Sequence, residues 1–160
     1  MFVLAGLGLF LAACGADDRA VISTSSQISS ADISISTVLV GSPSTIRLGV
    51  GTDDCLDIQV ADSEPERARG LSSRDDLGEI DGMLFVWEED VEASFYMYKT
   101  RFPISIGWYS ASGGPIGTAE MQPCLEPLPE DCPLYGPPGK YRYALETGSG
   151  GLGGGAIHGC

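Results

Sequence analysis

The residues of this chain that could do acid–base chemistry are mainly carboxylates. Glu120 and Glu146 lie on or beside predicted strands. Two carboxyl groups that face one pocket could share the proton transfers of a hydrolytic reaction. The spacing of Glu120 and Glu146 in the sequence does not fix the distance between their carboxyl groups. The alternative is that both are solvated side chains at strand ends. The pair therefore supports a hydrolase hypothesis that depends on the fold.

Nucleophilic and metal chemistry have weaker support. A Ser-His-acid triad needs a histidine within hydrogen-bond reach of the nucleophile. The single histidine, His158, lies two residues before the end of the sequence in a glycine-rich segment, where we expect surface or tail packing. The cysteines include no C-x-x-C pair, so we expect neither a metal site nor a cofactor.

Two arginines are candidates for binding an anionic group. Arg69 and Arg74 flank the sequence GLSS in an acid-rich region. A guanidinium can hold a carboxylate through two parallel hydrogen bonds, so either arginine could clamp a carboxylate ligand. The alternative is a structural ion pair with a nearby acid such as Glu66 or Asp75.

An aromatic run near the middle of the chain is the other binding candidate. If the segment is a strand, Phe95 and Met97 lie on one face and Tyr96 and Tyr98 on the other. One set should fill the core. The other set could offer rings to a sugar or peptide, although plain packing is the alternative.

The elements that position these residues are predicted to be short strands. Alternating apolar residues or β-branched and aromatic content mark strands at 55–61, 82–88, 92–98, 104–110, 115–121 and 141–147. One helix of about two turns is predicted at 63–70, where Ser63 and Glu66 match a capping box and Gly70 can end the helix. Many short strands without alternating helices predict an antiparallel β-sandwich or barrel with one short helix.

The first residues resemble an export signal. Residues 1–13 are apolar and too short to span a membrane, and Leu11-Ala12-Ala13-Cys14-Gly15 resembles a bacterial lipobox. We expect cleavage before Cys14 and lipidation of its thiol, which would anchor the protein to the cell membrane or outer membrane on the extracytoplasmic side. The alternative is a generic secretory signal with an incidental cysteine.

The remaining chain is predicted to be a tether and one domain. Residues 14–52 are rich in Ser, Thr and Gly and indicate a flexible tether, although ISISTVLV from Ile33 could form an edge strand. Residues 53–160 are predicted to form a single domain.

The cysteine count agrees with this organisation. Lipidation of Cys14 leaves four of the five cysteines. Cys124 and Cys132 bound a short Pro-rich loop that can bring its ends together, and Cys55 with Cys160 then follows by elimination.

Charge excludes one class of partner. The chain carries 22 acidic and 9 basic residues, a net charge of −13, so it lacks the clustered Lys and Arg that bind a phosphate backbone. We therefore expect no nucleic-acid partner.

Six motifs in order resemble the family of domain of unknown function 192 (DUF192). They are VADSEPERARGL, GMLFVW, SFYMYKTRFPISI, EMQPC, CPLY and YALE, beginning at residues 60, 82, 94, 120, 132 and 143. The resemblance implies a mainly β, jelly-roll-like domain, commonly exported or membrane-tethered, with no established activity. This chain differs from the usual pattern at Tyr96, where relatives carry Trp, and at Ser105, where they carry Asp.

These observations lead to three functional hypotheses. The leading one is a lipid-anchored module that binds a small molecule, glycan or protein partner in the cell envelope without chemistry. An envelope hydrolase acting on glycan or peptide through Glu120 or Glu146 is the second, and a structural or assembly accessory is the third. Convergence of Arg69, Thr100 and an acid in one cavity would favour the first two. The predicted binding residues are Arg69, Tyr96, Thr100, Ser105 and Tyr135.

Overall fold

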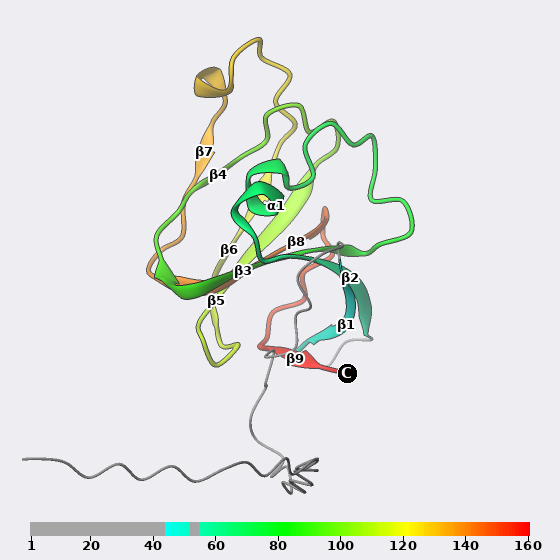
Figure 1. Cartoon of the computed structure of the whole chain (residues 1–160), viewed down its shortest axis with the longest axis vertical. Coiled ribbons are helices and arrows are strands. Elements are labelled where there is room, and N and C mark those ends of the chain that lie inside the picture. Colours follow the sequence, from blue (N-terminus) through cyan, green and yellow to red (C-terminus); the bar gives the residue numbers. More distant parts are fainter. Residues whose placement is uncertain (1–43, 52–54) are drawn as a thin grey trace, which may run out of the picture. The chain divides into compact units, whose positions relative to one another are not determined.

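The computed structural model describes residues 44–51 and 55–160, so the predicted signal, Cys14 and most of the predicted tether lie outside these residues. The described part is mainly β (Figure 1). Its elements in chain order are β1 Thr45–Val50, β2 Leu56–Ala61, α1 Glu64–Arg69, β3 Gly82–Val91, β4 Phe95–Tyr96, β5 Ile104–Tyr109, β6 Pro115–Met121, the 3-10 turn η1 Pro129–Asp131, β7 Leu134–Tyr135, β8 Tyr141–Gly148 and β9 Ile157–Gly159.

Seven of these strands form one curled sheet in the order β6-β5-β8-β3-β2-β1-β9, and β4 pairs with β7 in a second, two-stranded sheet. All pairs in both sheets are antiparallel except β2 with β3, which are parallel. That parallel pair needs a crossover connection, and α1 lies within it. The predicted mainly β fold with one short α-helix is confirmed, with the difference that the large sheet is mixed.

The sheet begins before the predicted domain boundary and includes the end of the chain. Residues 45–50 were assigned to the tether, but they form β1, whose Leu48 and Val50 are buried. No strand was predicted in the glycine-rich tail, yet Ile157–Gly159 forms β9 and pairs with β1. The Ile157 amide also donates to the Gly113 carbonyl in the β5–β6 turn at 2.9 Å, which connects the two ends of the curled sheet.

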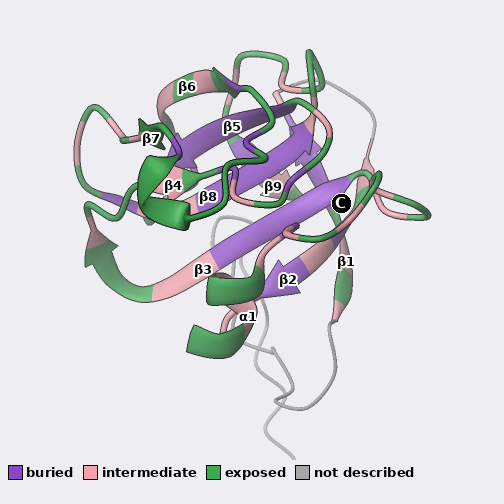
Figure 2. Cartoon of the chain, turned by 90° about the horizontal axis from the view of Figure 1, so that it is seen from above, coloured by how far each residue is buried: buried purple, intermediate pink, exposed green. Residues whose placement is uncertain are grey.

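The helix α1 begins and ends as its sequence predicts. Ser63 and Glu66 form the capping box, and the amide of Ser63 donates to the Glu66 carboxylate at 3.1 Å. Gly70 ends the helix at a φ of 49°, in the left-handed region that glycine tolerates. Arg67 then donates to the Val86 carbonyl at 2.9 Å, which holds α1 beside β3 (Figure 2).

The two faces of the large sheet carry separate buried clusters; β5 and most of β8 are buried, whereas β3 is buried only at its start, Gly82–Phe85 (Figure 2). We call the first the cavity face; its buried residues include Met83, Phe85, Ile106, Trp108 and Ala144. We call the second the closed face; its buried residues are Leu48, Val50, Ile58, Leu84, Tyr109, Leu145 and Ile157. Strand alternation explains the division, since Leu84 and Leu145 alternate with Met83 and Ala144.

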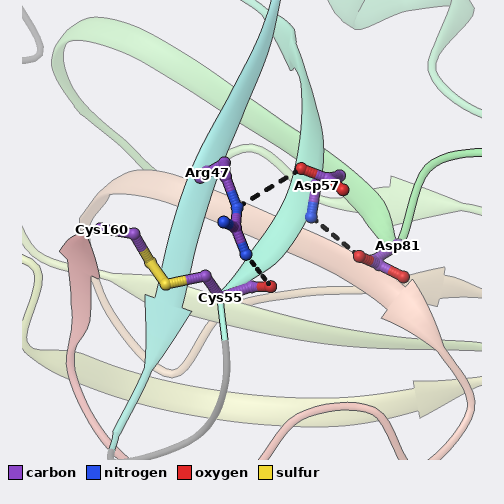
Figure 3. Close-up of polar contacts among 5 residues, drawn as sticks. All are labelled: Arg47, Cys55, Asp57, Asp81 and Cys160. Carbon is purple, nitrogen blue, oxygen red and sulfur yellow. Dashed lines mark hydrogen bonds and ion pairs between the residues drawn. A yellow bond between two sulfur atoms is a disulfide. The ribbon is translucent and has the colours of Figure 1, made fainter.

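A disulfide joins Cys55 to Cys160 at the β1–β2–β9 end of the sheet, with 6.2 Å between the Cα atoms (Figure 3). Arg47 supports the same region: its guanidinium donates to the Cys55 carbonyl at 3.3 Å and lies 3.7 Å from the Asp57 carboxylate. The Asp57 amide in turn donates to the Asp81 carboxylate at 2.8 Å. The disulfide and these contacts fasten β1, β2 and β9 together.

The second disulfide joins Cys124 to Cys132, with 5.8 Å between the Cα atoms. Both predicted cysteine pairs therefore lie at disulfide distance. The loop between them contains η1, and Cys124 is held next to β4 because its amide donates to the Met97 carbonyl at 3.3 Å. The Lys99 amide donates to the Cys124 carbonyl at 3.0 Å, so this disulfide supports the segment that follows β4.

Candidate functional site

A cavity of about 620 Å³ lies on the cavity face, lined by residues from α1, β3, β4, β8 and the segments after α1 and β4. Its buried lining residues form a floor, and its exposed lining residues form a rim. The floor consists of Leu71, Phe85, Met97, Thr100 and Glu146. The rim includes Glu64, Arg69 and Tyr96.

Glu146 is the ionisable group of the floor. It lies on the central strand β8, opposite Met83 of β3 and Ile106 of β5, and only 5% of its surface is exposed. Its carboxyl group makes no hydrogen bond or ion pair with any residue that the structure describes. Burial raises the pKa of Glu146 to about 8, because a carboxylate loses hydration there and gains no partner. The group is therefore mostly protonated at neutral pH.

Thr100 is the second polar floor residue. It is 4% exposed, and its amide donates to the Met97 carbonyl at 2.9 Å, which turns the chain after β4 back towards the cavity. Its hydroxyl makes no hydrogen bond within residues 44–51 and 55–160. The floor thus offers a ligand one carboxyl and one hydroxyl group in apolar surroundings.

The two arginines of α1 differ in what they contact. Arg67 is engaged by the protein, since it donates to the Val86 carbonyl and its guanidinium lies 5.5 Å from the centre of the Trp87 ring. Arg69 is exposed at the rim and has no hydrogen bond or ion pair in the described part of the chain.

The structural ion pairs expected as the alternative for Arg69 are not formed, because both acids have other partners. Glu66 caps α1 through Ser63, and Asp75 pairs with Arg101. Arg74 is likewise engaged, donating to the Gln59 side chain at 2.7 Å. Arg69 therefore remains available to a ligand.

Aromatic rings form one wall of the cavity. Phe95 lies edge-on to Phe85, with ring centres 5.1 Å apart, and to Trp87 at 6.3 Å. Tyr96 is 47% exposed, whereas Met97 is buried, as the predicted alternation requires for these two residues; Tyr98, predicted on the face of Tyr96, instead packs against the same buried cluster as Phe95. The Tyr98 hydroxyl donates to the Pro127 carbonyl at 3.3 Å, which holds its ring at the cavity next to the Pro-rich loop.

Two non-glycine residues at the cavity have a backbone in the left-handed region: Ser73 of the rim, at a φ of 66°, and Lys99, between the lining residues Tyr98 and Thr100, at 57°. The Ser73 amide donates to the Lys99 carbonyl at 3.0 Å, and the Ser72 hydroxyl donates to the Tyr98 carbonyl at 3.0 Å. Such conformations cost roughly 1–3 kcal/mol each and persist where surrounding contacts enforce them. These bonds join the segment after α1 to the segment after β4 and so hold two walls of the cavity together.

The structure brings together three of the five predicted binding residues, Arg69, Tyr96 and Thr100, in one cavity. Ser105 and Tyr135 do not line it. The Ser105 hydroxyl donates to Glu120 and accepts from the Gly150 amide at 2.8 Å, and the Tyr135 hydroxyl accepts from the Gln122 amide at 3.1 Å.

Glu120 and Glu146 do not share a pocket. Glu120 lies opposite Ser105 and Glu146 opposite Ile106, adjacent residues of β5 whose side chains point to opposite faces. Glu120 is exposed, as the alternative for it predicted, and its pKa is lowered chiefly by the Ser105 hydrogen bond and further by Ser149. The same expectation for Glu146 was wrong, because β8 is an interior strand.

His158 packs away from the cavity, in the expected tail-packing position. Its ring covers Gly49, where an added Cβ would lie 2.3 Å from the ring, and its Nε2 is 3.0 Å from the Gly51 carbonyl oxygen. Within residues 44–51 and 55–160 no three His, Cys, Asp or Glu side chains gather in a way that could hold a metal ion. None of the described helices has the length and apolar character needed to cross a membrane.

The fold and the site define a small β domain with a ligand-sized cavity between its sheet, its single α-helix and a disulfide-supported loop. The chain belongs to the DUF192 family, described as uncharacterized ACR, whose model matches residues 47–155. This assignment confirms the family indicated by the six sequence motifs.

Two solved structures have a similar fold. One is a protein of unknown function from Novosphingobium aromaticivorans, with 24% identity, a TM-score of 0.57 and coverage of 71% of this chain and 84% of the other. The second, from Sinorhizobium meliloti, has a description that proposes a role in transcription regulation; identity is 20%, the TM-score 0.64 and coverage 74% and 96%. At these identities the likeness shows the fold alone. No curated protein matches the chain.

Proposed function

We propose that this protein is a binding module that holds a small ligand in the cavity between α1, β3, β4 and β8. The observation that carries the proposal is Glu146, a buried carboxyl group without a protein partner on the floor of a cavity of about 620 Å³. Burying such a group costs stability, and unpaired buried acids with raised pKa values are typical of functional sites.

The remaining lining supports the same function. Ligand cavities commonly measure about 300–1,000 Å³ and combine apolar walls with a few polar groups. Here the walls are aromatic, Thr100 supplies a hydroxyl on the floor, and Arg69 supplies an unengaged guanidinium at the rim. Arg69 would hold an anionic group of the ligand, while Phe95 and Tyr96 would contact its apolar body.

We further propose that this module is anchored to a membrane on the extracytoplasmic side through lipidated Cys14. The apolar residues 1–13 and the lipobox-like residues around Cys14 support the anchor. The two disulfides support an oxidising compartment. Mass spectrometry of membrane-extracted protein should detect a diacylglycerol-modified Cys14 at the new N-terminus. A Cys14→Ser variant should leave the membrane fraction, and its retention there would contradict the anchor.

A thermal-shift screen with sugars, peptides and carboxylates tests the binding role. We expect at least one anionic ligand to raise the melting temperature, and Arg69→Gln to weaken its binding about tenfold. Arg101→Gln is the matched control, because Arg101 is an exposed arginine that does not line the cavity. A complete screen without a binder, or equal losses in both variants, would contradict the proposal.

Catalysis is the second candidate, because a carboxyl group with a pKa of about 8 can act as a general acid near neutral pH. The arrangement with Glu120 as the partner carboxylate is not formed, so this candidate depends on Glu146 alone. Mass spectrometry of ligand incubated with the protein separates the two functions: binding predicts unchanged ligand, and catalysis predicts a product that Glu146→Gln no longer forms.

A further inference from the structure

The floor of the cavity lacks a positive charge to balance Glu146. The charged residues that line the cavity are Glu64, Arg67, Arg69 and Glu146. Arg67 is held by the Val86 carbonyl and the Trp87 ring, while Arg69 and Glu64 are exposed at the rim. Burial raises the pKa of Glu146, and its carboxyl group forms no ion pair with an arginine among the described residues.

Resting on the binding function proposed above, we propose that the floor takes the ammonium group of a small amine, which forms an ion pair with the Glu146 carboxylate beside the aromatic wall. An amine that also carries a carboxylate would place that group at Arg69. The ligand class is therefore a primary amine with an apolar body, and an amino acid with an aromatic side chain would use both ends of the cavity.

An ammonium group fits the floor better than a neutral group does. It supplies the missing opposite charge together with three N–H donors, which Glu146 and Thr100 can accept. The faces of aromatic rings also attract cations, and the Trp87 ring already holds the guanidinium of Arg67 at 5.5 Å. The net charge of −13 favours the approach of cations from solution over that of anions.

Ion pairing in the cavity has a measurable consequence for protons. Glu146 is mostly protonated before binding at pH 7, and the ammonium group would favour its ionised form. Binding of the cationic amine should therefore release close to one proton per site. Its affinity should rise about tenfold per pH unit below pH 8 and level off above that value, because an aliphatic amine stays protonated over this range. A ligand that accepts a hydrogen bond from protonated Glu146 would show the opposite trend.

Four probes that share a phenyl ring test the inference with the full-length protein. Phenethylamine carries only the ammonium group, 3-phenylpropionate only the carboxylate, phenylalanine both and 2-phenylethanol neither. Titration calorimetry in two buffers of different ionisation enthalpy measures affinity and proton release together. Glu146→Gln keeps the shape of the side chain and removes its charge. Glu89→Gln is the matched control, because Glu89 is an exposed carboxylate on β3 that does not line the cavity.

We expect phenethylamine to bind more tightly than 2-phenylethanol, with proton release and a tenfold or greater loss in Glu146→Gln but a change below about twofold in Glu89→Gln. Equal effects of the two variants, or equal affinity for the amine and the alcohol, would overturn the inference. Binding of 3-phenylpropionate or 2-phenylethanol without binding of phenethylamine would show that the ligand is not an amine, but it would agree with the proposed binding function. If no probe binds, the inference of an amine ligand is wrong. The thermal-shift screen with sugars, peptides and carboxylates then tests the proposed binding function separately.

Discussion

Glu120 and Glu146 lie on the two strands that flank β5, yet their environments are opposite. On the closed face, Glu120 is exposed and accepts hydrogen bonds from Ser105 and Ser149, which lower its pKa. On the cavity face, Glu146 is buried without a described partner, and burial raises its pKa to about 8. The surroundings of Glu120 stabilise its ionised form, and those of Glu146 destabilise it.

A similar contrast holds between two regions of the molecule. At the β1–β2–β9 end of the sheet, the Cys55–Cys160 disulfide and Arg47 have all their partners within the protein. The cavity face keeps Arg69, Thr100 and Glu146 without side-chain partners in the described residues. A carboxylate on a strand therefore acquires its role from the face to which it points. Four measurements test these differences.

Removal of the Cys55–Cys160 disulfide should have the largest effect. The two cysteines are 105 residues apart, and in the chain-entropy model a loop of that length stabilises the fold by nearly 5 kcal/mol. The double variant Cys55→Ala/Cys160→Ala should lose most of this amount in urea unfolding. The matched variant Cys124→Ala/Cys132→Ala opens a separation of only 8 residues and should lose about 2.5 kcal/mol. Equal losses would show that the β1–β2–β9 end of the sheet does not depend on the longer link.

Glu146→Gln should have the next largest effect, and its sign depends on pH. The folded-state pKa of about 8 lies above the usual 4.5, so the folded state binds the extra proton between these values and the wild-type protein loses stability as pH rises. We expect a loss of about 3 kcal/mol between pH 5 and pH 8, at about 1.4 kcal/mol per pH unit. Glu146→Gln should abolish this slope in urea unfolding, whereas Glu120→Gln should keep it. An unchanged slope in Glu146→Gln would refute the buried-acid interpretation.

Ser105→Ala should have a smaller effect of opposite pH dependence. It removes the chief hydrogen bond that lowers the pKa of Glu120 and should cost about 1 kcal/mol at neutral pH. A lowered carboxylate pKa gives stability above the unfolded-state value that is lost as pH falls, so the deficit of the variant should shrink in acid. Unfolding at pH 7 and pH 3 measures this change. A deficit that grows in acid would contradict the assignment.

Arg69→Gln should change stability least, by under about 0.5 kcal/mol, because Arg69 is exposed and makes no described contact with the protein. The nearby Arg67→Gln variant loses the bond to Val86 and the contact with Trp87 and should cost about 1–2 kcal/mol. Thermal unfolding of the two variants side by side separates a binding arginine from a structural one. A substantial loss of stability in Arg69→Gln would show that Arg69 has a structural role like that of Arg67.

The sequence predicted the strands in which apolar residues alternate with polar ones or in which β-branched and aromatic residues are frequent. It missed strands that depend on partners far along the chain. Residues 55–61, 82–88, 104–110, 115–121 and 141–147 contain β2, β3, β5, β6 and β8 or most of their lengths. Strands β1 and β9 were missed because β1 is stabilised by pairing with β2 and β9, and β9 by pairing with β1, rather than by their own composition. The predicted strand at 92–98 is reduced to Phe95–Tyr96, since the chain then turns towards Cys124.

The candidate site was predictable only in part for a related reason. Arg69, Tyr96 and Thr100 lie within two of the family motifs, and all three line the cavity. Glu146 was assessed as a strand-end acid, and its burial depends on β8 lying between β3 and β5, which local pattern does not reveal. Phe85 and Trp87 were assigned only to a strand, and their alternation in GMLFVW is the signal that could have placed both rings on one face.

The hydrogen bond from the Ile157 amide to the Gly113 carbonyl bears on self-association. An outermost strand ordinarily presents free amide and carbonyl groups that can recruit a strand from another molecule. Here β9 is three residues long, and one of its outward donors is already used by the turn between β5 and β6. Intermolecular β-pairing at this border of the sheet is therefore disfavoured, which protects a protein crowded against its neighbours from polymerising.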